Sequence, residues 1–402
     1  MKIVQILPTF SCGDAIGNHT LSLHFQFQKR GIESEIYAER IAERLKQYAK
    51  PIEAYQNLAE DIILYHMSTG SKLNRSVTQF HGIRIMYYHN ITPPSFFEPY
   101  NTEAYNSCKS AYDDLKAIAD KFDMVVGASN YNINELKKYG FRCPMIALPI
   151  NIPFEDYKML PNHSVIEKYK DGYTNIIFVG RIAPNKRQEK VIEDFFYYHT
   201  QYNAKSRLIL VGNYGGMERY YLRLKRFVAK NHIEDVVFTG HIPFNEILAY
   251  YSIADLFLCE SMHEGFCVPL VESMIFSVPV LAYGSSAIPE TLGTGGIVHT
   301  SDDSRKTAEF MNSLSQDEID SMARTYTEGY RIGFINGRKD ITKKKTVNIR
   351  YNLGFERMVR AAILQFREMG LEPVIYRHAT HAVNKRGNAW IGFVGGNANP
   401  QY

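Results

Sequence analysis

Cysteines are few in this sequence, and their positions exclude two kinds of stabilising site. There are five among 402 residues, and no two have the spacing of zinc ligands. A disulfide framework and a cysteine metal site are therefore not indicated, and the pattern is typical of a reducing compartment.

No stretch approaches the roughly 18 apolar residues of a membrane-spanning helix. The first apolar run ends at Pro8 and is too short for a signal peptide. We expect a cytoplasmic protein that is at most peripheral to the inner face of a membrane.

Excess charge of one sign is also small. The 46 basic and 42 acidic residues leave a net charge of +4, which falls short of a nucleic-acid-binding protein. This mild charge is compatible with an anionic substrate or an acidic membrane face.

Two nucleotide-binding patterns are missing as well. No Gly-x-Gly-x-x-Gly follows the first predicted strand, which disfavours a dinucleotide-dependent oxidoreductase. No Asp-x-Asp pair, the common clamp for a metal-bound nucleotide, occurs in the chain.

The order of predicted elements indicates an α/β protein with two parallel, doubly wound sheets. The chain is too long for one ordinary core, and short apolar runs alternate with helical patterns in each half. In the first half, strands are predicted at 2–7, 33–37, 62–65, 83–88, 124–126 and 145–148, and helices at 19–30, 104–121 and 131–139. In the second half, strands are predicted at 176–179, 207–211, 236–239, 256–259 and 278–282, and helices at 186–198, 217–230 and 244–251.

Two prolines mark the boundary between the halves. Pro149 and Pro153 bar regular structure on either side of a short segment, which we interpret as a hinge. We predict Rossmann-like domains at 1–152 and 153–350. A helix and tail at 351–402 are predicted to pack back on the first domain. Because ligands of wound sheets bind at the carboxyl ends of the strands, we expect the binding site in a cleft between the two domains.

One segment at a strand-to-helix junction has the chemistry of a phosphate site. Residues 263–272 read His-Glu-Gly-Phe-Cys-Val-Pro-Leu-Val-Glu, follow a predicted buried strand and open a helix. Unpaired N–H groups and the helix dipole favour phosphate at such a junction. The junction is formed by Gly265, Phe266, Cys267 and Val268. Glu264 and Glu272 flank them, and carboxylates bind hydroxyl pairs through charge-assisted hydrogen bonds.

A second segment supplies positive charge at the end of another strand. Arg181 follows the predicted strand 176–179, and Lys186 begins the next helix. Both are placed to reach a diphosphate and to neutralise the charge that develops on a leaving group, which is work otherwise done by a metal. We therefore expect a site that needs neither a metal nor another cofactor.

Together these segments resemble family 4 of the retaining glycosyltransferases, which have the two-domain GT-B fold. The resemblance covers the second half of the chain in the right order, and the further matching segments are 237–243, 254–257, 279–280 and 289–290. It implies that Glu272 holds the ribose of a UDP- or GDP-linked sugar and that Glu264 holds the transferred hexose. Arg181 and Lys186 would then bind the diphosphate.

The resemblance also implies where the base and the phosphates bind. The backbone near His241 and Ile242 would meet the nucleobase, and the junction 265–268 would meet the phosphates. Cys267 departs from the family, which usually has glycine there. A small side chain is tolerated if only the backbone N–H is used.

The first half matches less sharply and is interpreted as the acceptor-binding domain. Its first glycine-containing loop resembles the family loop that lies under the donor phosphate and beside the acceptor, with Gly13 against the donor and Asp14 near the acceptor. His89 ends a predicted strand and resembles the family histidine that contacts the transferred sugar. His66 and Ser68 occupy an equivalent strand end, where we expect them to line the acceptor site.

The implied reaction is retaining hexosyl transfer to a hydroxyl of a glycan or lipid-linked acceptor, as in bacterial polysaccharide and O-antigen synthesis. We expect no nucleic-acid partner, and contact with a membrane through the first domain. One alternative is a sugar-nucleotide 2-epimerase, which needs acid/base residues beside the sugar and no acceptor pocket. Another is an inactive glycosyltransferase-like scaffold. Loss of Glu272, Arg181 or Lys186 would indicate such a scaffold, and all three are present.

Overall fold

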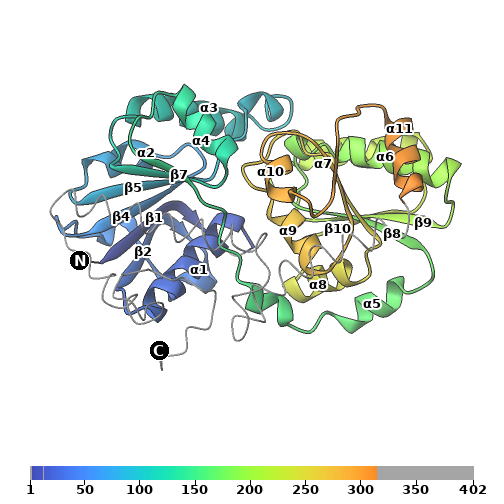
Figure 1. Cartoon of the computed structure of the whole chain (residues 1–402), viewed down its shortest axis with the longest axis horizontal. Helices are drawn as coiled ribbons and strands as arrows, with labels where there is room; N and C mark the ends of the chain where they lie inside the picture. Colours follow the sequence, from blue (N-terminus) through green and yellow to red (C-terminus); the bar gives the residue numbers. More distant parts are fainter. Residues whose placement is uncertain (1, 12, 315–402) are drawn as a thin grey trace, which may run out of the picture. The chain divides into compact units, whose positions relative to one another are not determined.

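The computed structural model describes residues 2–11 and 13–314, which divide into two compact units (Figure 1). Within the described residues, the first unit comprises 2–91 and 110–152, and the second comprises 92–109 and 153–314. Each unit contains one parallel sheet. The predicted helix and tail at 351–402 lie outside the described residues.

The first unit contains a seven-stranded parallel sheet with the order β3-β2-β1-β4-β5-β6-β7. Its strands are β1 (Ile3–Phe10), β2 (Ser34–Ile41), β3 (Ala49–Pro51), β4 (Ile62–Met67), β5 (Ile83–Tyr88), β6 (Met124–Gly127) and β7 (Met145–Ala147). The helices are α1 (Ala15–Lys29), α2 (Leu73–Ser76), α4 (Asn130–Lys138) and the second half of α3 (Thr102–Ile118), whose first half, up to Lys109, belongs to the second unit. Helix α1 lies on one face of the sheet and α3 and α4 lie on the other (Figure 1). The central strands β1 and β4 are mostly apolar because both of their faces are covered, and Gln5 and His66 are buried polar exceptions.

The second unit contains a six-stranded parallel sheet with the order β10-β9-β8-β11-β12-β13. Its strands are β8 (Thr174–Val179), β9 (Ser206–Val211), β10 (Val236–Gly240), β11 (Leu256–Cys259), β12 (Val280–Tyr283) and β13 (Ile297–His299). The helices are α5 (His163–Tyr169), α6 (Gln188–Gln201), α7 (Glu218–Lys230), α8 (Phe244–Ser252), α9 (Val268–Ile275), α10 (Ile288–Leu292) and α11 (Ser304–Ser313). Helices α6 and α7 cover one face and α8 covers the other (Figure 1).

The predicted two-sheet α/β architecture is confirmed, with element ends displaced by a few residues. Two short edge strands, β3 and β13, were not predicted, because three residues carry too little periodicity to be recognised. The helix predicted from Lys186 begins instead at Gln188, since Arg187 has a left-handed backbone with φ of 50°. Among the described helices, none is both long and apolar enough to cross a bilayer.

A largely buried polar cluster in the second unit comprises Lys190 and Asp194 on α6, Glu260 after β11 and His299 at the end of β13. Lys190 on α6 forms an ion pair with Asp194, and His299 Nε2 lies 2.7 Å from Glu260 Oε1. Neither Asp194 Oδ2 nor Glu260 Oε2 has a hydrogen-bond partner among the described residues. Burial, followed by the nearby charge of Glu260, raises the pKa of Asp194 to about 7.

Asp194→Asn is expected to remove a pH-dependent loss of stability. An unfolded aspartate has a pKa of about 3.9. As the pH rises from about 4 to about 7, the unfolded chain therefore releases its proton first, and the wild type loses about 4 kcal/mol of stability. Above that range both states are ionised and the loss stays constant. Asparagine still accepts the Lys190 hydrogen bond.

Urea unfolding of wild type and variant at pH 4.5 and pH 8 measures this effect. The free energy of unfolding of Asp194→Asn relative to wild type should increase with pH. Asp113→Asn, at an exposed position of α3, should show no such trend. A wild-type-to-variant difference that is the same at both pH values would contradict the assignment.

Candidate functional site in the second unit

The candidate site lies at the carboxyl edge of the second sheet. Because all six strands are parallel, the segments that follow them emerge at the same edge. Lys186 lies in the short 3-10 helix η6 (Pro184–Lys186) after β8, and Glu264 lies in the loop between β11 and α9. Two residues 78 positions apart in the chain therefore meet at this edge.

Lys186 and Glu264 form a mostly buried ion pair. Lys186 Nζ donates to Glu264 Oε1 at 2.5 Å, and the side chains are 22% and 8% exposed. Burial lowers the pKa of Lys186, but the charge of Glu264, its hydrogen bond and the nearby Cys267 and Cys259 together raise the pKa above the usual value. The ammonium group is therefore held charged in a site of low dielectric constant, where it stabilises a neighbouring anion more strongly than in water.

Two residues that the sequence did not reveal hold this pair in place. Asn185 Nδ2 donates to the carbonyl oxygen of His263 at 3.1 Å, and its own carbonyl accepts from Met262 N at 2.8 Å. Ser286, after β12, accepts a hydrogen bond from Glu264 N at 2.7 Å. The loops after β8, β11 and β12 are thus tied together beneath the ion pair. No sequence signal marks an asparagine or a serine for such a role.

Glu272 is bound by two tyrosine hydroxyls. Tyr157 donates to its Oε1 at 2.6 Å and Tyr251 donates to its Oε2 at 2.7 Å. Burial raises the pKa of Glu272, and the two hydroxyl bonds oppose that rise. Burial and the charge of Glu272 also raise the pKa of each tyrosine, so both remain protonated donors. The carboxylate is oriented by these bonds and retains lone pairs for ligand hydroxyls.

Tyr157 comes from the 3-10 helix η5 (Phe154–Lys158), immediately after the predicted hinge, and Tyr251 comes from α8. No sequence signal marks either tyrosine for this role. Three segments that are distant in the chain meet at Glu272, and only the tertiary fold brings them together.

The predicted junction between strand and helix is present at 265–268. Helix α9 begins at Val268 with Pro269 as its second residue, a position that needs no backbone N–H donor. Cys267, the N-cap, has φ of 73°, a left-handed conformation that costs a non-glycine residue roughly 1–2 kcal/mol. Gly265 and Phe266 complete the loop that leads from Glu264 to the helix. Glycine adopts such a backbone without this cost, which gives a physical reason for the glycine expected at this position from the family resemblance.

Arg181, His241 and Ile242 also lie at the carboxyl edge of this sheet. Arg181 is exposed, and its Nη2 donates to the carbonyl oxygen of Gly215 at 2.9 Å. His241 and Ile242 directly follow β10. The ends of β8 and β9 approach so closely that a Cβ at Gly212 would lie 1.9 Å from the carbonyl oxygen of Gly180. Only glycine fits at that position.

The first unit holds the other predicted residues. Gly13 has φ of 72°, and Asp14 caps α1 by accepting from Gly17 N at 3.2 Å. His89 follows β5, and Ser68 follows β4. His66, predicted to line an acceptor site, lies within β4, is fully buried and is bonded through both ring nitrogens.

Comparisons with known proteins show which family and which relatives the chain is similar to. Residues 161–331 match the model of the family glycosyl transferases group 1. The O-antigen chain mannosyltransferase B of Escherichia coli is 26% identical over 257 residues, which are 61% of this chain and 63% of that protein. The chain spans less than two thirds of the length of the first curated relatives it matches.

Two solved structures show the same fold. A glycosyltransferase from Rickettsia africae superposes with a TM-score of 0.63 at 15% identity, covering 91% of this chain and 99% of that one. HepE from Anabaena, in complex with UDP-glucose, superposes with a TM-score of 0.62 at 17% identity, covering 82% and 95%. The chain has the GT-B fold of these proteins, and its residues 161–331, which carry Lys186, Glu264 and Glu272, match the group 1 glycosyl transferases.

Proposed function

We propose that the chain transfers a hexosyl group from a nucleoside-diphosphate sugar to a hydroxyl of a glycan or lipid-linked acceptor, with retention of anomeric configuration. The observation that carries the proposal is the buried Lys186–Glu264 ion pair at the carboxyl edge of the second sheet. It places a fixed cation beside a carboxylate that accepts hydroxyl hydrogen bonds, as transfer from a sugar diphosphate requires.

Each site residue has a defined task in this proposal. Glu272, oriented by its two tyrosines, accepts hydrogen bonds from the ribose hydroxyls, and Glu264 accepts from the hexose. Lys186 and Arg181 neutralise the diphosphate as the bond between the anomeric carbon and the phosphate oxygen breaks. The bond from the anomeric carbon to the acceptor oxygen forms on the same face. The departing diphosphate takes the proton of the acceptor hydroxyl.

The relatives suggest which donor to test first. The E. coli relative is named a mannosyltransferase, which makes GDP-mannose the first choice, and the Anabaena structure contains UDP-glucose. We propose that transfer needs no metal, because Lys186 and Arg181 supply the positive charge and the sequence has no Asp-x-Asp clamp. An acceptor on a lipid carrier would bring the first unit to a membrane surface.

Thermal unfolding with a panel of UDP- and GDP-sugars, with EDTA throughout, tests the donor site. A donor at 100 times its dissociation constant stabilises the folded chain by about 2.7 kcal/mol, which gives a measurable rise in the melting temperature. Radiolabelled donor and a glycan acceptor then test transfer. Donor binding without transfer would favour the inactive scaffold, and appearance of the epimeric sugar nucleotide would favour the epimerase.

A further inference from the structure

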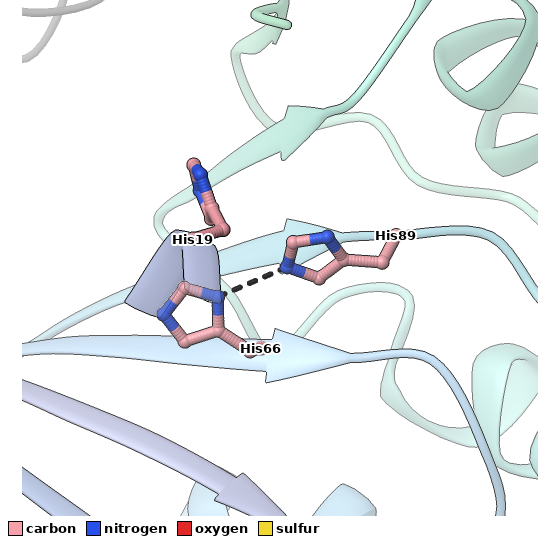
Figure 2. Close-up of side chains that lie close together, drawn as sticks. All are labelled: His19, His66 and His89. Atoms are coloured by element: carbon pink, nitrogen blue, oxygen red, sulfur yellow. Dashed lines mark hydrogen bonds between the residues drawn. The ribbon is translucent and has the colours of Figure 1, made fainter. Parts of the chain in front are cut away.

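Three buried histidines gather in the first unit from three different elements. His19 comes from α1, His66 from β4 and His89 from the residue after β5, and their exposed fractions are 1%, 0% and 9%. Figure 2 shows the His66 and His89 rings near one another, with His66 Nδ1 3.0 Å from His89 Nε2. Burial lowers the pKa of His19 to about 3 and the pKa of His66 and of His89 well below the usual value. All three rings are therefore neutral at physiological pH.

The amide of Gln5 fixes the position of the proton on His66. Gln5 Nε2 donates to the carbonyl oxygen of Thr20 at 3.1 Å, so the amide oxygen faces the other way. That oxygen lies 3.1 Å from His66 Nε2. Because an amide oxygen only accepts hydrogen bonds, His66 Nε2 carries the proton and His66 Nδ1 is a bare acceptor.

The proton position on His89 follows from that of His66. His89 Nε2 must donate to the bare Nδ1 of His66, so the Nδ1 of the neutral His89 ring is unprotonated. His89 Nδ1 is buried and has no hydrogen-bond partner among the described residues. Tyr87 stacks on the His89 ring with centroids 4.6 Å apart, which limits how the ring can turn. His89 thus presents a single oriented acceptor.

A metal ion does not explain this cluster. One ring nitrogen from each histidine lies within 4.8 Å of one from each of the others, so the cluster resembles a three-histidine site. His19 Nδ1, however, accepts a hydrogen bond from the backbone N–H of Asn151 at 2.8 Å. The proton of the neutral ring is therefore on Nε2, the only other nitrogen, and neither nitrogen of His19 is available as a metal ligand.

We propose that Gln5 and His66 are positioning residues that hold His89 with Nδ1 unprotonated, so that His89 accepts a hydrogen bond from a hydroxyl of the bound sugar substrate. The role in substrate binding rests on the proposed function, whereas the proton positions do not. An unpaired buried acceptor favours a ligand that donates, and a sugar hydroxyl is such a donor.

Nuclear magnetic resonance of wild type with ¹⁵N-labelled histidine rings tests the proton positions without any substrate. Long-range ¹⁵N–¹H spectra distinguish protonated from bare ring nitrogens, and single His→Gln variants assign the signals. We expect Nε2–H and bare Nδ1 for His19, His66 and His89 at pH 7. A proton on His89 Nδ1 would overturn the proposal, whether or not the chain is a transferase.

Two substitutions of His66 then test the effect on transfer. In His66→Asn, the side-chain oxygen takes roughly the place of Nδ1 and still accepts from His89, whereas His66→Leu removes the acceptor. We expect His66→Leu to move the His89 proton to Nδ1 and to lower kcat/KM about tenfold, the effect of one lost hydrogen bond. His66→Asn should keep the wild-type His89 signals and lose about twofold. Thermal unfolding checks that both variants fold, and equal losses of kcat/KM in two folded variants would refute the positioning role.

Discussion

Lys186→Met is expected to lower the rate of sugar transfer by about two to three orders of magnitude, the cost of removing one preorganised charge from a developing anion. Lys186 Nζ is held by Glu264 at 2.5 Å and is charged before substrate arrives. Its loss should therefore reduce kcat more than it changes KM. Single-turnover transfer from a radiolabelled sugar nucleotide measures the chemical step directly.

This substitution also leaves Glu264 buried without its partner, which destabilises a protein by about 3–5 kcal/mol in comparable cases. Lys190→Met is the matched control, since it removes the cation of another buried ion pair in the same unit. Both variants should unfold at lower temperature, but only Lys186→Met should slow transfer per folded molecule. Similar losses of specific activity in the two variants would show that Lys186 has only a structural role.

Glu272→Gln is expected to weaken binding of the sugar nucleotide roughly 10- to 100-fold, because hydrogen bonds to a charged group contribute about 1.5–3 kcal/mol. The glutamine amide also places an NH₂ group against one of the two tyrosine hydroxyls that now donate to the carboxylate. That hydroxyl must rotate to accept a hydrogen bond from the amide, so the glutamine side chain is held less firmly than the carboxylate. Isothermal titration calorimetry with UDP and GDP, and with their sugar conjugates, measures the effect.

The bare nucleoside diphosphates distinguish the roles of the two glutamates. If Glu272 holds the ribose, its substitution lowers the affinity for the bare nucleoside diphosphate and for the sugar conjugate equally. Glu264→Gln should lower the affinity for the sugar conjugate only. Glu309→Gln, at an exposed position of α11, controls for a change of charge in the same unit. Unchanged affinity for all ligands in Glu272→Gln would remove Glu272 from the binding site.

Much of the fold could be predicted because its signals are local. Parallel strands covered on both faces are short apolar runs, and the helices between them have caps and a 3.6-residue period. The position of Pro269 predicts a helix that begins next to it, and α9 begins at Val268. The left-handed backbone of Arg187 shortened the next predicted helix, because an arginine in that conformation carries no sequence signal.

The sequence by itself determined the order of the elements, the two parallel sheets, the strand ends that Lys186, Glu264 and His89 follow, and the helix that carries Glu272. These follow from periodicity, turn residues and the rule that parallel strands end at one edge. Only the tertiary structure decided the partners of these side chains: Tyr157 and Tyr251 on Glu272, Ser286 beneath Glu264, and the Gln5–His66 chain behind His89. Such partners come from segments distant in the chain, and hydrogen-bond geometry depends on distances that no local pattern encodes.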